Sequence, residues 1–314
     1  MAFALRLSGV TKRYGSFVAV SNLSLHIETG VVYGILGPNG AGKTTTLRMI
    51  NDIIRPDEGE IRILGEHPPG REAARRIGYL PEERGLYPKM RVGEILRFFG
   101  ELRGLSGRDA QKRGDVWLER LELSDWKLKK LQDLSKGMQQ KIQFVTAVIH
   151  EPELLVLDEP WSGLDPINAE VLREIVLEQK RAGRTILFST HLMEQAEKLC
   201  DSVCIIARGK QVLEGELAAI KRNAHGDRLV ALGFADGVTA DTIDWDRGMV
   251  VNRRERGDHL EVELAPGVAP DALLAVLVGA GVKLRRFEMI EPSLHQIFVD
   301  RVGADAAEGD RGQP

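Results

Sequence analysis

A glycine-rich run between an apolar segment and a helical one constrains this chain more than any other part of its sequence. Residues 37–44 read Gly-Pro-Asn-Gly-Ala-Gly-Lys-Thr and directly follow the apolar run Val31–Leu36. A buried strand followed by this spacing predicts a P-loop, in which backbone amides and the start of a helix surround phosphate groups. We expect Lys43 to contact the β- and γ-phosphates of ATP and the Thr44 hydroxyl to bind Mg²⁺. The ATP-binding residues predicted from this run are Gly37, Pro38, Asn39, Gly40, Ala41, Gly42, Lys43, Thr44 and Thr45.

Two carboxylates follow a second apolar run. The segment Leu154–Leu157 is typical of a buried strand, and Asp158 and Glu159 come directly after it. Beside a P-loop, a carboxylate at the end of a strand is suited to holding Mg²⁺ through water, which we expect of Asp158. Glu159 is expected to act as the general base toward the attacking water. The two motifs together predict hydrolysis of ATP.

The pattern around these motifs predicts an α/β fold. Short, unbroken apolar runs such as Ile186–Phe188 and Val203–Ile206 alternate with amphipathic helical stretches. Such runs suit the central strands of a mainly parallel sheet covered on both faces, here a P-loop NTPase core. The first thirty residues alternate between apolar and polar, which predicts an antiparallel N-terminal β portion. Between residues 85 and 149 the pattern is almost wholly helical, so we expect an inserted helical subdomain there.

The sequence pattern changes after about Asp227. Alternating strands, a Gly257-Asp258 turn and a helix at Pro270–Gly279 predict a small α+β module. The last twelve residues are rich in Gly, Ala, Asp and Glu and are expected to be disordered. We therefore assign residues 1–222 to a nucleotide-binding domain, 223–302 to a C-terminal accessory domain and 303–314 to a tail.

The composition argues against several classes of protein and partner. A net charge of −3 gives no overall basic footprint, so no nucleic-acid partner is expected. Cys200 and Cys204 are too few for a disulfide scaffold, and no further ligands cluster near them for a metal site. No apolar run reaches the roughly 20 residues that a membrane span needs. We expect a cytoplasmic chain whose membrane role comes through a partner.

A third motif suggests the family. The run Leu-Ser-Lys-Gly-Met-Gln-Gln precedes a predicted helix, and Ser135 is a good N-cap for that helix. The run resembles the L-S-G-G-Q signature of ABC ATPases. Ser135 and Gly137 match that signature, whereas Lys136 replaces its first glycine and Met138 its glutamine. The resemblance implies that Ser135, Gly137 and Gln139 close over an ATP bound to a second copy of the chain.

Further matches extend the resemblance over about residues 3 to 218. Tyr14 corresponds to the aromatic residue on which the family stacks adenine, and His191 to the histidine that contacts the γ-phosphate. The loop that crosses the family's dimer interface corresponds to Ser162, Gly163, Leu164 and Asp165. The resemblance thus implies catalytic roles for Lys43, Glu159 and His191.

One position departs from the family pattern. Glu82 stands where the family usually has a glutamine after proline, and its carboxylate is a further expected ligand of Mg²⁺ together with Thr44 and Asp158. The segments Gly78–Met90 and Glu291–Phe298 are similar to an exporter subgroup. That subgroup includes sodium-efflux and drug or antibiotic-resistance ATPases with a C-terminal accessory domain.

The resemblance implies an ATP-hydrolysing transporter subunit on the inner face of the cell membrane. It implies a homodimer or pseudo-dimer of such subunits and a separate transmembrane permease, whose coupling helix is expected in a groove lined by Glu83–Met90. One alternative is a soluble ABC protein acting on ribosomes or DNA, but the chain has one cassette and no room for long coiled coils. Another is a metabolic P-loop kinase, which the signature argues against. For the C-terminal domain, dimer stabilisation competes with ligand sensing.

Overall fold

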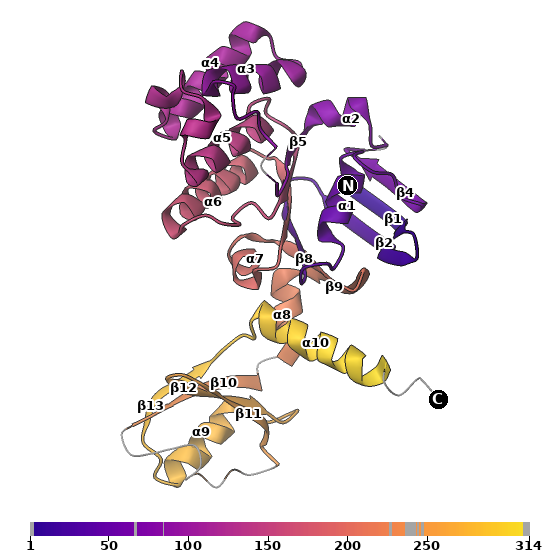
Figure 1. The fold of residues 1–314 in the computed structure, drawn as a ribbon. Coiled ribbons are helices and arrows are strands. Elements are labelled where there is room, and N and C mark those ends of the chain that lie inside the picture. The colour runs from indigo at the N-terminus through magenta and orange to yellow at the C-terminus, as the bar shows by residue number, and fades with distance from the viewer. Residues whose placement is uncertain are drawn as a thin grey trace. The chain divides into compact units, whose positions relative to one another are not determined.

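The computed structural model spans all 314 residues and describes residues 3–65, 68–83, 85–225, 228–235, 243, 245 and 248–309. The chain divides into two compact units, Met1–Gly215 and Glu216–Pro314 (Figure 1). The first unit contains a six-stranded and a three-stranded sheet, the second unit contains a four-stranded sheet, and each unit has its own buried core.

A six-stranded sheet forms the centre of the first unit. Its strands run in the order β5-β6-β7-β3-β8-β9, and neighbours from β5 to β8 are parallel. Every residue of β3, β6 and β7 is buried, which explains why their sequences do not alternate. The predicted parallel core is therefore confirmed. The strands are β3 (Val32–Leu36), β5 (Ile77–Leu80), β6 (Leu154–Asp158), β7 (Thr185–Thr190), β8 (Ser202–Ala207) and β9 (Lys210–Glu216).

A smaller antiparallel sheet in the order β2-β1-β4 completes the core of this unit, as predicted. Leu5 and Leu7 of its central strand lie in the same core as Leu47 and Met49 of the helix after the P-loop. At the end of the hairpin, Tyr14 pairs with Phe17 across a two-residue turn. The strands are β1 (Phe3–Tyr14), β2 (Phe17–Glu28) and β4 (Glu58–Ile63), and the helix is α1 (Lys43–Ile50).

Helices follow where the sequence pattern predicted them. The segment predicted as a helical subdomain, residues 85–149, contains α3, α4 and α5, which group away from the small sheet (Figure 1). Ser106, Ser135 and Asp165 begin α4, α5 and α6 by accepting backbone hydrogen bonds in the first turn. The bounds are α2 (Arg71–Arg76), α3 (Val92–Leu102), α4 (Gly107–Arg120), α5 (Lys136–Val148), α6 (Pro166–Arg181) and α7 (Met193–Leu199), with 3-10 turns at Ser124–Trp126 and Leu131–Asp133.

The second unit is an antiparallel sheet in the order β11-β12-β10-β13 with a helix packed on it. Val230 and Val262 of the sheet share a buried cluster with Leu273 and Leu277 of α9. The predicted turn at residues 257–258 joins β11 to β12, as expected. The elements are α8 (Leu217–His225), β10 (Leu229–Phe234), β11 (Val250–Arg256), β12 (His259–Leu264), α9 (Pro270–Gly279), β13 (Leu284–Met289) and α10 (Leu294–Gly309).

Two predicted limits differ from the structure. The units divide after Gly215, whereas the predicted boundary at residue 222 falls inside α8. The expected tail begins at residue 303, but α10 continues to Gly309. Alanine and glutamate are good helix formers, which explains why this segment extends the helix that begins at Leu294. Residues 310–314 and Asp227 lie outside the described residues, as does Arg84 in the predicted coupling groove. Within the described part of the chain, no helix is both long and apolar enough to span a membrane.

Candidate active site

The P-loop turns sharply between β3 and α1. Gly37 has a φ of 152°, and a Cβ at this position would lie 2.1 Å from the carbonyl oxygen of Ile206 on β8. Only glycine fits so close to a neighbouring strand. The amide of Gly209 donates to the carbonyl of Ala41 at 3.0 Å and holds the far side of the loop. The loop therefore delivers the first amides of α1 to one fixed place.

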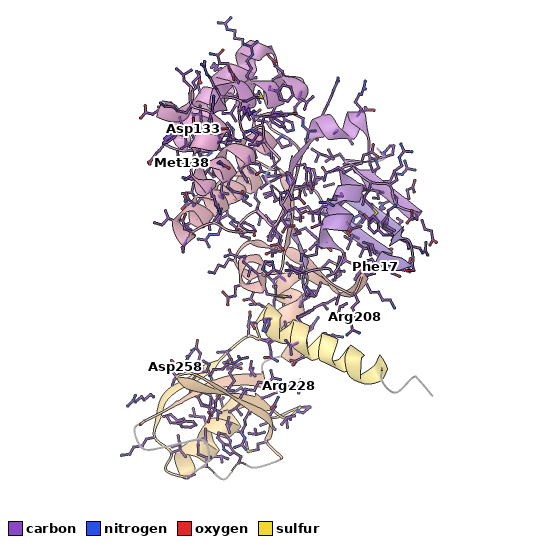
Figure 2. All side chains as sticks on the ribbon, viewed as in Figure 1. Phe17, Asp133, Met138, Arg208, Arg228 and Asp258 are labelled. Carbon is purple, nitrogen blue, oxygen red and sulfur yellow. The ribbon has the colours of Figure 1, made fainter. Side chains whose placement is uncertain are left out.

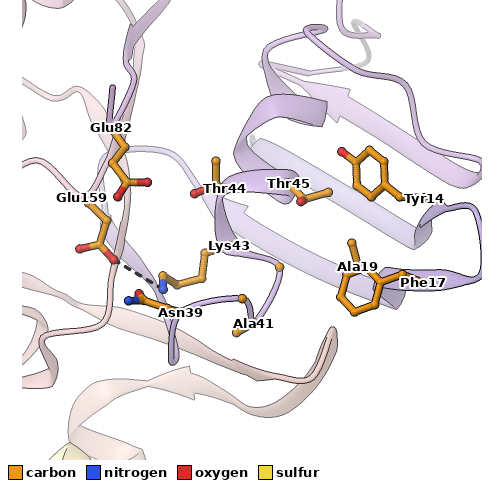
Figure 3. A pocket seen from close by; sticks show the side chains of 12 residues that line it. Tyr14, Phe17, Ala19, Asn39, Ala41, Lys43, Thr44, Thr45, Glu82 and Glu159 are labelled. Carbon is orange, nitrogen blue, oxygen red and sulfur yellow. Dashed lines mark ion pairs between the residues drawn. The ribbon is translucent and has the colours of Figure 1, made fainter. Parts of the chain in front are cut away.

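A pocket of about 390 Å³ opens at this loop (Figure 3). It is bounded by the P-loop on one side, by the tip of the β1–β2 hairpin on another, and by two carboxylates. Its lining residues are Tyr14, Phe17, Ala19, Asn39, Gly40, Ala41, Gly42, Lys43, Thr44, Thr45, Glu82 and Glu159. One end is thus aromatic and the other is rich in amides, hydroxyls and charge, which suits a ligand with a flat base and an anionic tail.

Lys43 is buried at the base of the pocket. Its Nζ donates to the carbonyl oxygens of Gly37 at 2.8 Å and Pro38 at 3.2 Å. It also lies 3.5 Å from Oε1 of Glu159, the ion pair drawn in Figure 3. The ammonium is therefore held by neutral carbonyls and one carboxylate, and an incoming anion can replace them.

Asp158 has one satisfied and one unsatisfied carboxylate oxygen. Its Oδ1 accepts from the hydroxyls of Ser189 at 2.6 Å and Thr44 at 3.2 Å. Its Oδ2 is buried and has no hydrogen-bond partner among the described residues. Burial raises the pKa of this carboxyl, although the hydroxyls of Ser189 and Thr44 oppose the rise. A buried, unpaired oxygen beside the P-loop hydroxyl needs a donor or a cation.

Glu159 is positioned by the residues that end β7. Its Oε1 lies 2.9 Å from Nδ1 of His191, and its Oε2 accepts from the Thr190 hydroxyl at 3.2 Å. The backbone of Glu159 itself has a φ of 46°, a conformation that non-glycine residues adopt with strain. Strain of this kind is typical of residues whose side chain must point in one direction. The carboxylate lines the pocket, and His191 and Thr190 hold its two oxygens.

The serine-containing motif lies elsewhere in the first unit. The Ser135 hydroxyl oxygen accepts from the Met138 amide at 3.3 Å, so its predicted role as the N-cap of α5 is confirmed. Figure 2 shows Met138 on the side of this unit opposite to Phe17 of the pocket. A Cβ on Gly137 would lie 2.9 Å from the side chain of Asn168, so this motif packs against the start of α6. The motif therefore does not line the pocket of its own chain.

Comparison with known proteins agrees with this geometry. The sequence profile of ABC transporters matches residues 20–162. The uncharacterized ABC transporter ATP-binding protein YhaQ of Bacillus subtilis is 45% identical over 96% of this chain and 99% of its own length. The chain belongs to the ABC transporter ATP-binding proteins. It is accordingly a member of an ATPase family, as the motifs predicted.

Other relatives of this ABC ATPase carry names from resistance and export. The daunorubicin resistance ATP-binding protein DrrA3 of Streptomyces coeruleorubidus is 33% identical over 96% of each chain. The profile of the C-terminal domain of DrrA1-3-like ATP-binding proteins matches residues 215–302, which confirms the predicted subgroup. A solved ATP-binding subunit of an ABC transporter is 33% identical with a TM-score of 0.64, covering 70% of this chain and 92% of its own.

The predicted site residues of the ABC ATPase fall into two places. The pocket brings together Tyr14, residues 39–45, Glu82 and Glu159. Asp158 and His191 border it through Thr44 and Glu159. Gly37 and Pro38 border it through their carbonyl oxygens, which accept from Lys43. Away from the pocket are the remaining predicted residues: Ser135, Gly137, Gln139, Ser162, Gly163, Leu164 and Asp165.

Gln139 and Asp165, two of the residues away from the pocket, form hydrogen bonds within their own chain. The side-chain amide of Gln139 donates to the carbonyls of Leu131 at 3.3 Å and Leu134 at 3.0 Å, so it closes the loop before α5. The carboxylate of Asp165 caps α6, and hydrogen bonds from Asn168 lower the pKa of Asp165. Both contacts give these residues a structural role whatever else they do.

Phe17 and Ala19 line the pocket although the motifs did not indicate them. The signal was present in the hairpin, because a two-residue turn after Tyr14 puts Phe17 directly across from it. The aromatic end of the pocket therefore has two rings rather than one.

Proposed function

We propose that this chain hydrolyses ATP as one of two ATP-binding subunits of an exporter, and that a separate membrane permease carries the cargo. The observation that supports this most directly is the Glu159 carboxylate, held by His191 and Thr190 beside the P-loop lysine. A carboxylate positioned by a second group and facing a phosphate site is suited to general-base catalysis.

Binding of ATP would rearrange the base of the pocket. Lys43 is held by carbonyl oxygens and Glu159, and phosphate oxygens make stronger, charge-assisted hydrogen bonds to an ammonium than carbonyls do. The ammonium would move to the β- and γ-phosphates and leave Glu159. The carboxylate is then free to accept a proton from water, while His191 keeps its orientation and contacts the γ-phosphate.

Oxygen groups from α1, from the end of β6 and from the segment after β5 fit a magnesium ion. The unpaired Oδ2 of Asp158, the Thr44 hydroxyl and the Glu82 carboxylate are oxygen groups at one edge of the pocket. No cluster of three or more His, Cys, Asp or Glu side chains that could hold a metal occurs in the part of the chain that the structure describes. Mg²⁺ needs no such cluster beside a nucleotide, since one or two carboxylates, waters and the phosphates complete its shell. When bound, Mg²⁺ would neutralise charge on the β- and γ-phosphates.

A second copy of the chain would complete the site. The pocket leaves its contents open on one side, and the Ser135 motif is remote from it within the same unit. The N-terminus of α5 carries an amide-rich turn and no acidic residue in its first turn, which suits an anion. In a head-to-tail pair, Ser135 and Gly137 of one copy would cover the γ-phosphate on the other, and residues 162–165 would cross the interface.

The names of the relatives support export and a membrane partner. Daunorubicin and linearmycin resistance proteins are similar to this chain along almost its whole length. A hollow of about 190 Å³ in the first unit includes Leu86 and Pro88 among its lining. We place the permease contact in this region, at the cytoplasmic face of the membrane. For the second unit we propose dimer stabilisation.

The function is tested with Glu159→Gln in the full chain. The variant keeps the pocket but removes the base, so turnover should fall by about 100-fold or more while ATP binding persists. With ATP and Mg²⁺, the variant should elute as a dimer in size-exclusion chromatography. Glu153→Gln is the matched control, because Glu153 lies at the other end of β6 and pairs with Arg76 at 2.6 Å.

Each possible outcome of this experiment supports a different explanation. Turnover near that of the wild type in Glu159→Gln would remove Glu159 as the base. Loss of activity in Glu153→Gln as well would mean that stability of the sheet, rather than chemistry, explains both results. A monomer that hydrolyses ATP at the same rate at every protein concentration would contradict the shared site.

A further inference from the structure

Two short segments of the helical subdomain run antiparallel beside the start of α3. Arg91, in residues 88–93, lies directly opposite Lys130, in residues 127–132. Four backbone hydrogen bonds of 2.9 to 3.0 Å hold the two segments together. We call these segments the basic ladder, because they contain five cationic side chains and no Asp or Glu. The cations are Lys89, Arg91, Lys127, Lys129 and Lys130.

One face of the basic ladder belongs to the core, and the other carries charge. Val92 and Leu131 are buried, whereas Arg91 and Lys130, directly before them in sequence, are exposed. Side chains alternate between the two faces of an extended segment, and residues directly opposite each other share a face. Arg91 and Lys130 therefore point outward together. Leu128, between two lysines, is 72% exposed, so the outer part of the ladder combines cations with an apolar side chain that the core does not need.

Most of this positive charge has no partner within the chain. Lys127 pairs with Asp115 at 2.6 Å, but the other four cations form no ion pair in the part of the chain that the structure describes. The nearest acid in sequence is Glu94, whose carboxylate accepts from the backbone amide of Arg91 at 3.0 Å and caps α3. Like charges directly opposite each other across a ladder lower stability. The outer face is therefore suited to an anion from outside the chain.

The surrounding subdomain carries the same sign of charge. Residues 85–149 contain 13 Lys and Arg against 8 Asp and Glu, a net charge of +5 in a chain whose total is −3. Asp133, the first residue after the ladder, lies in Figure 2 on the side of the first unit opposite to Phe17 of the nucleotide pocket. The positive charge is thus concentrated away from the pocket that suits ATP.

We propose that the basic ladder binds the anionic headgroups of a phospholipid membrane, with Leu128 inserted among them. Ammonium and guanidinium groups make charge-assisted hydrogen bonds to phosphate, and anionic leaflets attract clustered Lys and Arg. An exposed leucine fits the interfacial zone of a bilayer. A nucleic acid is disfavoured, because single strands are bound through aromatic side chains that stack on bases, and the ladder contains none. This lipid affinity belongs to the chain itself and goes beyond the proposed function.

The lipid contact is separate from the hollow that we assign to the permease. Pro88 and Leu131 of the ladder line that hollow, whereas none of the five cations does. The two sets of side chains do not overlap, so a protein partner in the hollow would leave the outer face of the ladder to the lipid.

The test measures flotation of the full chain with vesicles, in the absence of permease and nucleotide. One set of vesicles is pure phosphatidylcholine, and the other contains equal parts of phosphatidylcholine and phosphatidylglycerol. We expect binding at least about tenfold tighter to the anionic set, weakened by salt. The double variant Arg91→Gln, Lys130→Gln should bind the anionic vesicles about 25-fold more weakly, at about fivefold for each basic residue. Leu128→Ser should weaken binding about tenfold.

The matched control is the double variant Arg181→Gln, Lys198→Gln. It makes the same change in net charge with two exposed residues outside the helical subdomain, and it should float as the wild type does. The ladder variant should keep its basal ATPase activity within about twofold and unfold at the same or a higher temperature, since it removes two facing like charges. Weak flotation with unchanged unfolding is a result that a purely structural role of these residues would not give.

Several results would overturn the proposal. Equal binding to the two sets of vesicles, or flotation with neither, would do so. An equal loss in the ladder variant and the control would show that net charge, rather than the ladder, governs binding. Tighter binding to a single-stranded RNA than to the anionic vesicles would assign the face to nucleic acid. None of these results bears on ATP hydrolysis or on the permease, so the proposed function stands or falls separately.

Discussion

The two ends of the central sheet carry similar charged side chains. They differ in whether those side chains have hydrogen-bond or ion-pair partners within the chain. At the carboxyl ends of the strands, Asp158 keeps an unpaired buried oxygen and Lys43 is held by carbonyls and a carboxylate. A pocket of about 390 Å³ opens there. Charge at this end is therefore available to a ligand.

The amino ends of the same strands show the reverse. Arg76 donates twice to Glu153, at 2.6 and 2.7 Å. Asp201 accepts from Lys180 at 2.6 Å and from the backbone of Val32 at 2.8 Å. Each of these four charged side chains is therefore paired with one of opposite charge. Parallel sheets bind ligands outside the carboxyl ends of their strands. In this sheet the charged groups available to a ligand lie at that end, whereas the paired charges at the amino ends contribute to stability.

We expect the largest effect when one glycine at each end of the sheet is replaced by alanine. Gly37→Ala should abolish measurable ATP binding and lower the unfolding temperature, because its Cβ would lie 2.1 Å from a backbone oxygen of β8. Gly183, before β7, has a φ of 81° but nothing within 4 Å of a Cβ. Gly183→Ala should cost only about 1 kcal/mol of stability and leave ATP binding unchanged. Titration with a fluorescent ATP analogue and thermal unfolding measure the two effects.

Equal losses of nucleotide binding in the two glycine variants would break the comparison, since both ends would then act through stability alone. A Gly37→Ala variant that still binds ATP would show that the P-loop can shift away from β8.

Asp158 and Asp201, one at each end of the sheet, allow a second test of the difference between the ends. Burial raises the pKa of Asp158 above its value in the unfolded chain, so without metal its ionised form lowers stability at every pH above that folded-state value. Asp158→Asn should therefore unfold at a higher urea concentration in EDTA at pH 7, yet lose about 100-fold or more of its Mg²⁺-dependent turnover. Asp201→Asn should lose about 1 kcal/mol of stability and keep its turnover.

The aspartate experiment has a built-in check. If Mg²⁺ and ATP raise the unfolding temperature of Asp158→Asn as much as that of the wild type, Asp158 is not a ligand of the ion. If Asp158→Asn is less stable than the wild type in EDTA, its carboxylate is better satisfied than the structure indicates.

Much of the fold and the phosphate end of the site could be predicted from the sequence, because both depend on local spacing. The run ending at Leu36 and the glycines after it specify a strand, a turn and a helix in order. Asp158 is the last residue of a buried strand that is parallel to β7. Since parallel strands end at one edge, the predicted residues from both strands meet there.

The rest depended on tertiary contacts. Phe17 becomes a pocket residue only because of the register of its hairpin with Tyr14. The boundary after Gly215 differs from the predicted one because α8 belongs to the second unit, although its sequence continues smoothly from β9.

The smallest expected effect concerns His150, a titratable side chain that is buried near the amino ends of the strands and has no ion pair among the described residues. His150 accepts or donates one hydrogen bond, to the carbonyl of Ile77 at 3.1 Å, and its Nδ1 has no partner within the described chain. Burial and the charge of Arg103 lower the pKa of His150 from 6.5 to about 4. Between these values the unfolded chain binds a proton that the folded chain does not, so stability is full above pH 6.5 and is lost as the pH falls.

His150→Gln removes this titration and can still donate to Ile77. From pH 7 to pH 5.5, the wild type should lose about 1 kcal/mol of unfolding free energy that His150→Gln keeps. Urea unfolding at the two pH values measures the difference, with the carboxylates common to both proteins cancelling. Because the carboxyl ends are untouched, turnover at pH 7 should be the same in both. A change in turnover here would mean that the two ends of the sheet are not independent.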